Sequence, residues 1–378
     1  PTARRPDRND CRAMGFTCGI VGLPNVGKST LFNALTETMS AEAANYPFCT
    51  IEPNVGRVAV PDERIEKLAA LAGSATLLPT QLEFADIAGL VRGASKGEGL
   101  GNQFLAKIRE VDAIVHVLRC FEDDNITHVD GKIDPVADAE TVNTELLLAD
   151  LESVEKRADA AAKRAPSGDK EAKALHNVLQ KVLVVLQDGQ AARTVDIDKE
   201  EQKIFDGLQL LTAKPVLYVC NVEEDAAGEG NSQSARVAEM ATAEEASSVV
   251  ISAAIEAEVS QLDAEERTEF LETLGLSETG LARIIRAGYE LLDLITFFTV
   301  GPKEARAWTV RRGAKAPQSA GVIHTDFERG FIRAETIAYD DFINGGGELG
   351  AKDNGKMRAE GKEYVTCDGD VYHFRFNV

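Results

Sequence analysis

The chain has 378 residues, which is enough for two or three domains. Its hydrophobic content of 44% is ordinary for a globular protein, and no apolar run reaches the ~18–20 residues that cross a bilayer. A net charge of −21 argues against non-specific binding to naked nucleic acid, because phosphate contacts need clustered lysine and arginine. Six scattered cysteines form no CxxC pair, so neither a zinc site nor a disulfide framework is indicated, and reduced thiols in a cytosolic protein are expected.

Residues 1–13 are polar and Arg-rich, and we expect a disordered extension there, upstream of Met14. Residues 16–21 form a short apolar run, and a Gly-rich turn and a stretch of helical character follow it. Because similar apolar runs alternate with helical stretches, the pattern predicts an α/β fold with a mostly parallel sheet and helices on both faces. The other strand candidates are 82–87, 113–118, 216–220 and 249–252.

Two helical stretches between the third and fourth strand candidates have apolar residues spaced alternately four and three apart. This spacing is typical of the seam of a coiled coil, and residues 166–168 (Pro-Ser-Gly) separate the two stretches. We therefore predict a helical coiled-coil hairpin inserted at 126–204. The alternative is two ordinary helices packed on the core. The seam residues are Leu147, Leu151, Val154, Ala158 and Ala161, then Leu175, Leu179, Val182 and Leu186.

The pattern changes from about residue 295 to short β-rich segments, at 295–300, 307–310 and 332–337. Residues 365–372 indicate a hairpin with an Asp-Gly turn. These features predict a separate small α+β domain at 295–378. The nucleotide-binding domain described next would then be split into residues 14–125 and 205–290.

A phosphate-binding loop is predicted after the first strand. Residues 22–29, GLPNVGKS, match GxxxxGK[ST] in full, between a strand and a helix, which is the context that the motif requires. Glycines let backbone N–H groups surround phosphates, and the helix N-terminus adds a positive dipole. We expect Lys28 to reach the β- and γ-phosphates and the Ser29 hydroxyl to coordinate Mg²⁺. The predicted nucleotide contacts are Gly22, Leu23, Pro24, Asn25, Val26, Gly27, Lys28, Ser29 and Thr30.

Asp86 and Gly89 form a DxxG motif at the end of a strand candidate. The aspartate is expected to hold Mg²⁺ through water, and the glycine N–H can sense the γ-phosphate. Together with Lys28 these two are the expected catalytic residues. Thr50 lies in a segment flanked by glycine and proline and is the expected second hydroxyl ligand of Mg²⁺. The alternative for Thr50 is an ordinary loop threonine.

The residue after the DxxG glycine bears on the rate of hydrolysis. Many GTPases place a glutamine there, which orients the attacking water, but this chain has Leu90. Leucine cannot orient water, so another group must do so or basal hydrolysis must be slow. His116 lies inside an apolar strand and is expected to be a core histidine and not a base.

The base-binding motif departs from that of GTPases. Guanine is usually recognised by Asn-Lys-x-Asp after a late strand, where the carboxylate accepts from guanine N1–H and the exocyclic amine. Residues 221–224 are Asn-Val-Glu-Glu, and this change weakens the case for guanine and permits adenine. Glu223 is expected to belong to an acidic surface. The expected base contacts are Asn221, Val222, Glu224, Ser252, Ala253 and Ala254.

With these motifs the chain resembles the YchF (Obg-like ATPase) family, in the Obg branch of P-loop GTPases, over essentially all of 14–378. The resemblance implies a nucleotide-binding domain, an inserted coiled coil and a C-terminal ubiquitin-like TGS domain. It also implies a preference for ATP over GTP and association with the ribosome. The motifs that carry it are GLPNVGKS at 22–29, FCTIEPNVG at 48–56, DIAGLVRGA at 86–94, NVEE at 221–224 and SAAIEAE at 252–258.

The sequence therefore predicts a Mg²⁺-dependent enzyme that binds ATP, hydrolyses it to ADP and phosphate, and switches ribosome binding. We expect a cytoplasmic monomer that contacts the large ribosomal subunit and no membrane. A GTPase in ribosome assembly or translation is the alternative, and a module that holds ATP as a structural ligand is a third hypothesis. Arg311, Arg312 and Lys315 are expected to form a basic patch for RNA.

Overall fold

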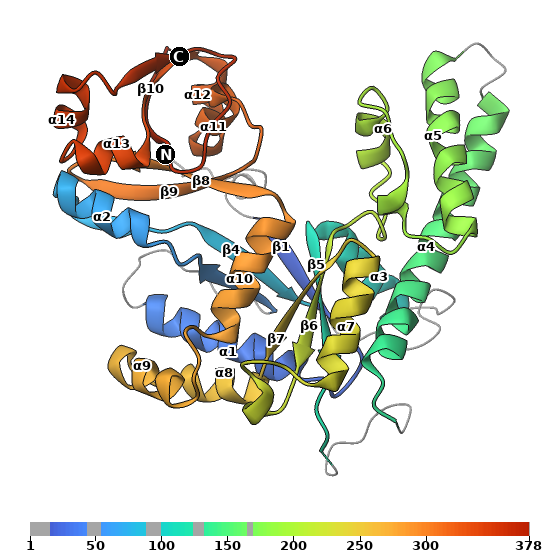
Figure 1. Cartoon of the computed structure of the whole chain (residues 1–378). Coiled ribbons are helices and arrows are strands. Elements are labelled where there is room, and N and C mark those ends of the chain that lie inside the picture. The colour runs from blue at the N-terminus through green and yellow to red at the C-terminus, as the bar shows by residue number, and fades with distance from the viewer. Residues whose placement is uncertain (1–15, 44–53, 88–99, 124–131, 165–168, 378) are drawn as a thin grey trace, which may run out of the picture.

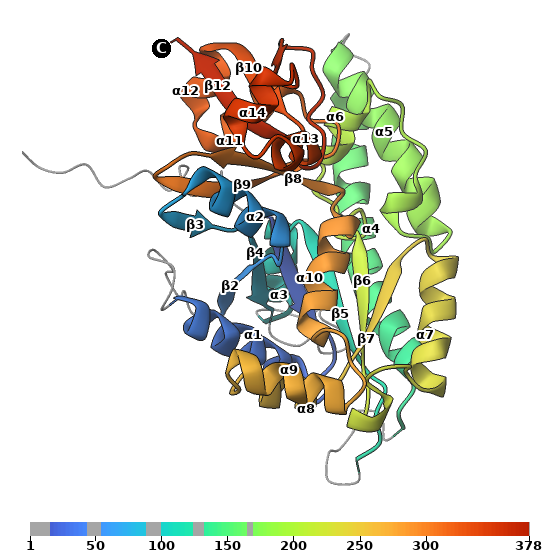
Figure 2. The same cartoon turned by 60° about the vertical axis from the view of Figure 1, so that its left-hand side comes forward.

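The computed structural model of the chain describes residues 16–43, 54–87, 100–123, 132–164 and 169–377 (Figure 1). The extension expected at 1–13 lies outside these residues. Two six-stranded sheets organise the described chain, and a helical arm projects from the first of them (Figures 1 and 2). Within the described residues, no helix combines the length and the apolar character that crossing a membrane requires.

The first sheet is mostly parallel, as predicted. Its order is β2-β4-β1-β5-β6-β7, and β2 runs antiparallel to β4. The central strands β5 and β6 are buried along their whole length, which explains their continuous apolar sequence. The strands are β1 (Thr17–Val21), β2 (Val55–Ala59), β4 (Gln81–Asp86), β5 (Ala113–Arg119), β6 (Val216–Asn221) and β7 (Ser247–Ile251).

Helices cover both faces of this sheet. The helices α1 and α10 pack on one face, and α7 packs on the other beside the start of α4 (Figure 2). The parallel arrangement brings the ends of β1, β4, β5 and β6 to one edge of the sheet. The helices of this unit are α1 (Lys28–Ala43), α3 (Leu100–Glu110), α7 (Ser232–Ala243), α8 (Ala253–Val259), α9 (Ala264–Thr273) and α10 (Gly280–Leu291), with a 3-10 turn η4 at Glu224–Ala226.

The arm is the predicted antiparallel hairpin, made of α4 (Pro135–Arg164) and α5 (Lys170–Gln187). Its predicted seam residues pack against one another in one apolar cluster. At the base of the arm the buried carboxylate of Asp150 accepts hydrogen bonds from the backbone N–H groups of Leu211 and Thr212, at 2.9 and 2.8 Å. The chain returns through a 3-10 turn η3 (Ala192–Thr194) and α6 (Gln202–Asp206).

The second sheet forms the C-terminal α+β unit and has the order β11-β10-β12-β8-β9-β3. The helices α2, α13 and α14 pack on one face, and α11 and α12 on the other. Its strands are β3 (Thr76–Leu78), β8 (Leu294–Val300), β9 (Glu304–Arg311), β10 (Phe331–Ile337), β11 (Arg358–Glu360) and β12 (Val371–Phe376). Its helices are α2 (Glu63–Ala72), α11 (Ala316–Ile323), α12 (Thr325–Arg329), α13 (Tyr339–Asn344) and α14 (Glu348–Asp353).

The hairpin predicted at 365–372 is wrong. The Asp-Gly turn is present, and Gly369 has φ 87°, but the residues before it do not pair with β12. Both edges of β12 are already occupied, because it lies between β10 and β8. Val365 instead forms an isolated bridge with Lys315.

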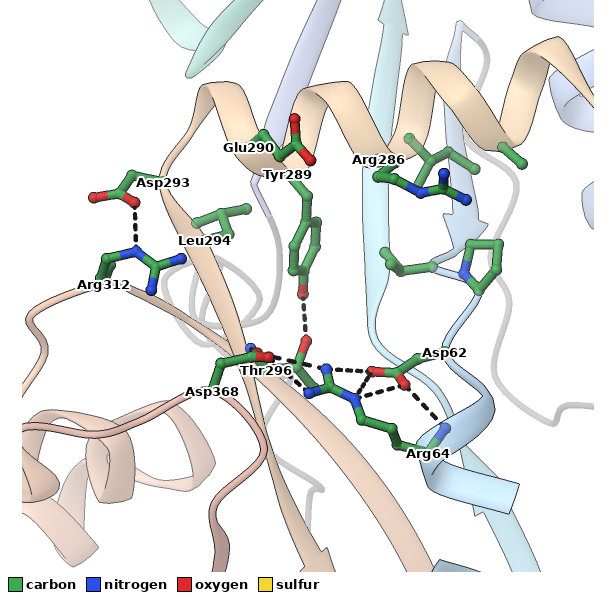
Figure 3. A pocket seen from close by; sticks show the side chains of 14 residues that line it. Asp62, Arg64, Arg286, Tyr289, Glu290, Asp293, Leu294, Thr296, Arg312 and Asp368 are labelled. Carbon is green, nitrogen blue, oxygen red and sulfur yellow. Dashed lines mark hydrogen bonds and ion pairs between the residues drawn. The ribbon is translucent and has the colours of Figure 1, made fainter. Parts of the chain in front are cut away.

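One chain segment, residues 55–78, links the two sheets. Its strand β2 belongs to the first sheet, while α2 and β3 belong to the second. The side chain of Arg64 joins Asp62 to Asp368 of the C-terminal unit, with N–O distances of 2.7 and 2.6 Å (Figure 3). Its guanidinium also lies 5.3 Å from the ring centroid of Phe298. Burial alone would lower the pKa of Arg64, but the two carboxylates raise it above its usual range.

Replacing Arg64 with methionine is expected to lower the free energy of unfolding by about 1–3 kcal/mol, since two carboxylates lose a shared cation. Thermal and urea unfolding of the full chain measure this. The matched control is Lys67→Met, because Lys67 makes a 3.6 Å pair with Glu63 in which both side chains are largely exposed. We expect the control to change stability by less than about 0.5 kcal/mol. Equal losses for both variants would contradict the prediction.

Candidate nucleotide-binding site

The loop between β1 and α1 has a backbone conformation that depends on glycine. Gly22 has φ 152° and Gly27 has φ 99°, a region that side chains other than glycine rarely adopt. A Cβ on Gly22 would lie 2.5 Å from the carbonyl oxygen of Val117, and one on Gly27 would lie 2.3 Å from Nδ2 of Asn221. The two glycines therefore allow the loop to fold closely over the ends of β5 and β6.

Lys28 is the first residue of α1 and is 8% exposed. Its Nζ atom donates to the carbonyl oxygen of Leu23 at 2.6 Å, so the ammonium lies back over the loop. Burial lowers the pKa of Lys28, and the negative charge of Asp86 partly opposes this. Asp86 ends β4 and is paired in register with Ile20 of β1, which places its carboxylate at the same edge of the sheet.

Asn221 connects the loop to the opposite wall of the site. Its Nδ2 atom donates to the carbonyl oxygen of Val26 at 3.0 Å, and its Oδ1 atom accepts from the N–H of Ala253 at 2.9 Å. Asn221 is buried, so both bonds are shielded from water. The side chain thus fixes the distance between the phosphate-loop motif and residues 252–254.

A cavity of about 760 Å³ lies between these two walls. Four predicted residues of the loop do not line the cavity: Gly22, Leu23, Pro24 and Val26. Of these, Leu23 and Val26 are buried and support the loop from the core. Thr50, Gly89 and Leu90 lie outside the described residues. The predicted residues that line the cavity are Asn25, Gly27, Lys28, Ser29, Thr30, Asn221, Val222, Glu224, Ser252, Ala253 and Ala254.

The base-side wall has exposed carboxylates, among them Glu224 and Asp225, and one buried hydroxyl. Glu224 begins the η4 turn and is exposed at the cavity. Ser252 is 2% exposed, and its Oγ has no hydrogen-bond partner among the described residues. Buried hydroxyls are normally bonded, so this one is available to a ligand in the cavity. Val222 occupies the position of the GTPase lysine and is 3% exposed.

Sequence reasoning missed part of this wall. Phe121, Glu122 and Asp123, which follow β5, also line the cavity. Glu223, expected to be a plain surface residue, accepts hydrogen bonds from the N–H of Glu122 and from Nδ2 of Asn231, both at 2.9 Å. An aromatic residue two positions beyond the end of a buried strand, at the edge where ligands bind α/β sheets, is the signal that could have identified Phe121.

His116 is buried, as predicted, and does not line the cavity. Burial lowers its pKa to about 3, and the nearby charge of Lys28 contributes. The ring packs beside Tyr218, with centroids 5.6 Å apart. At neutral pH the imidazole is therefore uncharged, and it lies within the core behind the cavity lining.

Comparisons with known proteins agree with this architecture. A family model described as "50S ribosome-binding GTPase" matches residues 17–150, and YchF-GTPase_C, described as a protein of unknown function (DUF933), matches residues 294–377. The "Ribosome-binding ATPase YchF" of Haemophilus ducreyi is 60% identical over 365 residues, which cover 97% of this chain and 100% of the relative. The protein of the same name from Bacillus subtilis is 57% identical over 367 residues, with the same coverage.

A solved structure agrees over the same length. "Structure of the Schizosaccharomyces pombe YchF GTPase" superposes with a TM-score of 0.86 at 39% identity, and the match covers 98% of this chain and 99% of that chain. Full-length similarity at this identity extends through the phosphate-loop unit, the arm and the C-terminal unit alike. The chain therefore belongs to the YchF family of P-loop proteins.

Proposed function

We propose that this chain binds ATP in the 760 Å³ cavity, hydrolyses it to ADP and phosphate, and uses the reaction as a switch for ribosome binding. The carrying observation is that one cavity joins the phosphate-loop residues Lys28 and Ser29 to the base-side residues 221–224 and 252–254. Its size suits a nucleotide, because ligand pockets span roughly 300–1,000 Å³. The curated relatives carry the name of an ATPase, which supports the same activity.

The phosphate end of the cavity supports a Mg²⁺-dependent reaction. Lys28 would bind the β- and γ-phosphates, and the Ser29 hydroxyl and the Asp86 carboxylate, through water, are hard oxygen donors suited to Mg²⁺. Mg²⁺ in nucleotide sites is usually bound by one or two protein oxygens together with phosphate oxygens, so the phosphates of ATP would complete the coordination. Thr50 as a further ligand and Gly89 as the γ-phosphate sensor remain proposals.

ATP is expected to bind several-fold more tightly than GTP, and a contrast of about 1.4 kcal/mol would be tenfold. The apolar Val222 and the exposed Glu224 do not reproduce the lysine and aspartate that recognise guanine. Isothermal titration of both nucleotides measures the contrast. The double variant Val222→Lys, Glu224→Asp should shift the preference toward GTP. Equal affinities in the unmodified protein would refute the prediction.

A GTPase is the second candidate, because some of the similar proteins are named GTPases and others ATPases. The matched family model and the Schizosaccharomyces pombe structure are described as GTPases, whereas the curated relatives are called ATPases. The same titration decides between the two candidates. A hydrolysis assay with each nucleotide, with and without ribosomes, tests the activity itself.

We infer that the ribosome is the partner, because the curated relatives are named for it and the matched family model names the 50S subunit. A cytoplasmic monomer with domains at 14–125 and 205–290, 126–204 and 295–378 fits this role, with the last as a TGS domain.

The basic patch proposed at Arg311, Arg312 and Lys315 is partly neutralised by ion pairs. Arg312 pairs with Asp293 at 2.9 Å, and Lys315 pairs with Glu363 at 2.5 Å. We propose both the helical arm and the C-terminal unit as targets for ribosome-binding variants.

A further inference from the structure

Arg119 is the last residue of β5 and is 1% exposed. Arginine is seldom buried to this extent, because removing its charge from water is costly unless its donors are used. In the sheet register Arg119 lies beside Asn221, which bridges the phosphate loop to residues 252–254. A buried cation therefore lies directly under the base-side wall.

The guanidinium of Arg119 holds the segment that follows it. Its Nε donates to the carbonyl oxygen of Phe121 at 3.2 Å, and one Nη donates to the carbonyl oxygen of Asp123 at 3.1 Å. Its central carbon lies over the Phe121 ring, 4.6 Å from the centroid. The planar guanidinium group carries several N–H donors and can make these contacts at the same time, whereas the ammonium group of lysine cannot.

The same segment is held from the other side. The N–H of Glu122 donates to Glu223, and the N–H of Cys120 donates to the carbonyl oxygen of Asn221 at 2.8 Å. These bonds fix the backbone of 120–122, while Arg119 fixes the Phe121 ring and the carbonyl of Asp123. Because Phe121 and Asp123 line the cavity, the arginine determines where this wall lies.

We propose that Arg119 is a positioning residue for base recognition: it touches no ligand and holds the Phe121–Asp123 wall against the nucleoside end of the cavity. The inference rests on the proposed function, nucleotide binding in this cavity. It predicts that loss of Arg119 weakens binding of the nucleoside part and leaves binding of the phosphate part unchanged, since Lys28 and Ser29 belong to the opposite wall.

The test compares ATP with inorganic tripolyphosphate, which has no base, in the presence of Mg²⁺. In Arg119→Met we expect ATP affinity to fall about tenfold, because the wall loses the cation–π contact with Phe121 and the hydrogen bonds to the carbonyl oxygens of Phe121 and Asp123. Tripolyphosphate affinity should change by less than about twofold, and KM for ATP should rise while kcat stays within about threefold. Arg119→Lys keeps the positive charge but lacks the planar guanidinium group. It should show the same loss of affinity for ATP, with the affinity for tripolyphosphate retained.

The matched control is Arg193→Met. Arg193 is also largely buried and pairs with Glu244 at 3.1 Å, but it does not line the cavity. This variant should lower the unfolding temperature without changing the ratio of ATP to tripolyphosphate affinity. If Arg119→Met does not fold, the same ratio in Arg119→Lys decides.

If the ratio of ATP to tripolyphosphate affinity is the same in the Arg119 variants as in the unmodified protein, the inference is overturned. This holds whether both affinities are unchanged or both fall equally. The proposed function fails separately, if the unmodified protein binds neither ATP nor GTP. The two failures are distinguishable, because the first appears only in the variants.

Discussion

Replacing Lys28 with alanine is expected to lower the rate of ATP hydrolysis by a factor on the order of 10²–10³, the usual effect of removing one donor to developing charge. The ammonium is buried at the edge of the cavity and donates only 2.6 Å away to Leu23, so it is already positioned beside the phosphate loop. ATP affinity should also fall, at least about tenfold. Phosphate release under steady-state conditions and titration calorimetry measure the two effects.

The stability of the same variant should not fall. Burial lowers the pKa of Lys28, so the charged form is less favourable in the folded protein than in the unfolded one. Removing it should leave the free energy of unfolding unchanged within about 0.5 kcal/mol, or raise it. The control is Lys214→Ala, because Lys214 donates to the carbonyl oxygens of Arg109 and Val111, away from the cavity. Turnover close to that of the unmodified protein in Lys28→Ala would refute the assignment of the phosphate site.

The sheet of the phosphate-loop unit was predictable because its strands are buried on both faces. Strands β5 and β6 lie between helices, so their sequences are continuous apolar runs that differ from the surrounding helices. The seam of the arm was predictable for a similar reason, since spacing of four and three residues follows from local helix geometry. In both cases the sequence pattern follows from the local geometry of one strand or one helix, so it can be recognised without knowledge of distant residues.

The elements that sequence reasoning missed depend on distant partners. Strand β3 has three residues, and its pairing with β9 joins residues more than two hundred positions apart. The apolar residues Ile65 and Leu68 of α2 pack into the core of the C-terminal unit and not onto the neighbouring sheet. Nothing local in a short strand or an amphipathic helix specifies which of two sheets it joins.

The candidate site divides in the same way. Lys28, Ser29 and Asn221 belong to linear motifs, whose spacing is set by the ligand that they surround. Glu223 and Arg119 act through segments that meet only in the folded chain, where β5 and β6 end side by side. An acid in an acidic run and an arginine at the end of a strand are both common in sequences, so neither residue type indicates that role.

A methyl group on Gly27 is expected to disrupt both walls of the cavity. In Gly27→Ala the new Cβ would lie 2.3 Å from Nδ2 of Asn221, so that side chain must move and lose its bonds to Val26 and Ala253. The positive φ of 99° adds backbone strain. We expect the free energy of unfolding to fall by about 2–4 kcal/mol and ATP affinity to fall at least tenfold.

Two comparisons isolate the clash from the strain. Gly73→Ala also places alanine at a positive φ, 64°, but its Cβ meets no atom within 4 Å, so it should cost only about 1–2 kcal/mol. In the background of Asn221→Ala, which removes the obstructing amide, the added effect of Gly27→Ala should shrink to that of Gly73→Ala. Residues in contact give non-additive effects of 0.5–3 kcal/mol, and chemical unfolding resolves a difference of about that size. Full additivity of the two substitutions would show that Gly27 is needed for its backbone conformation alone, and that the close approach of Asn221 does not hold the two walls together.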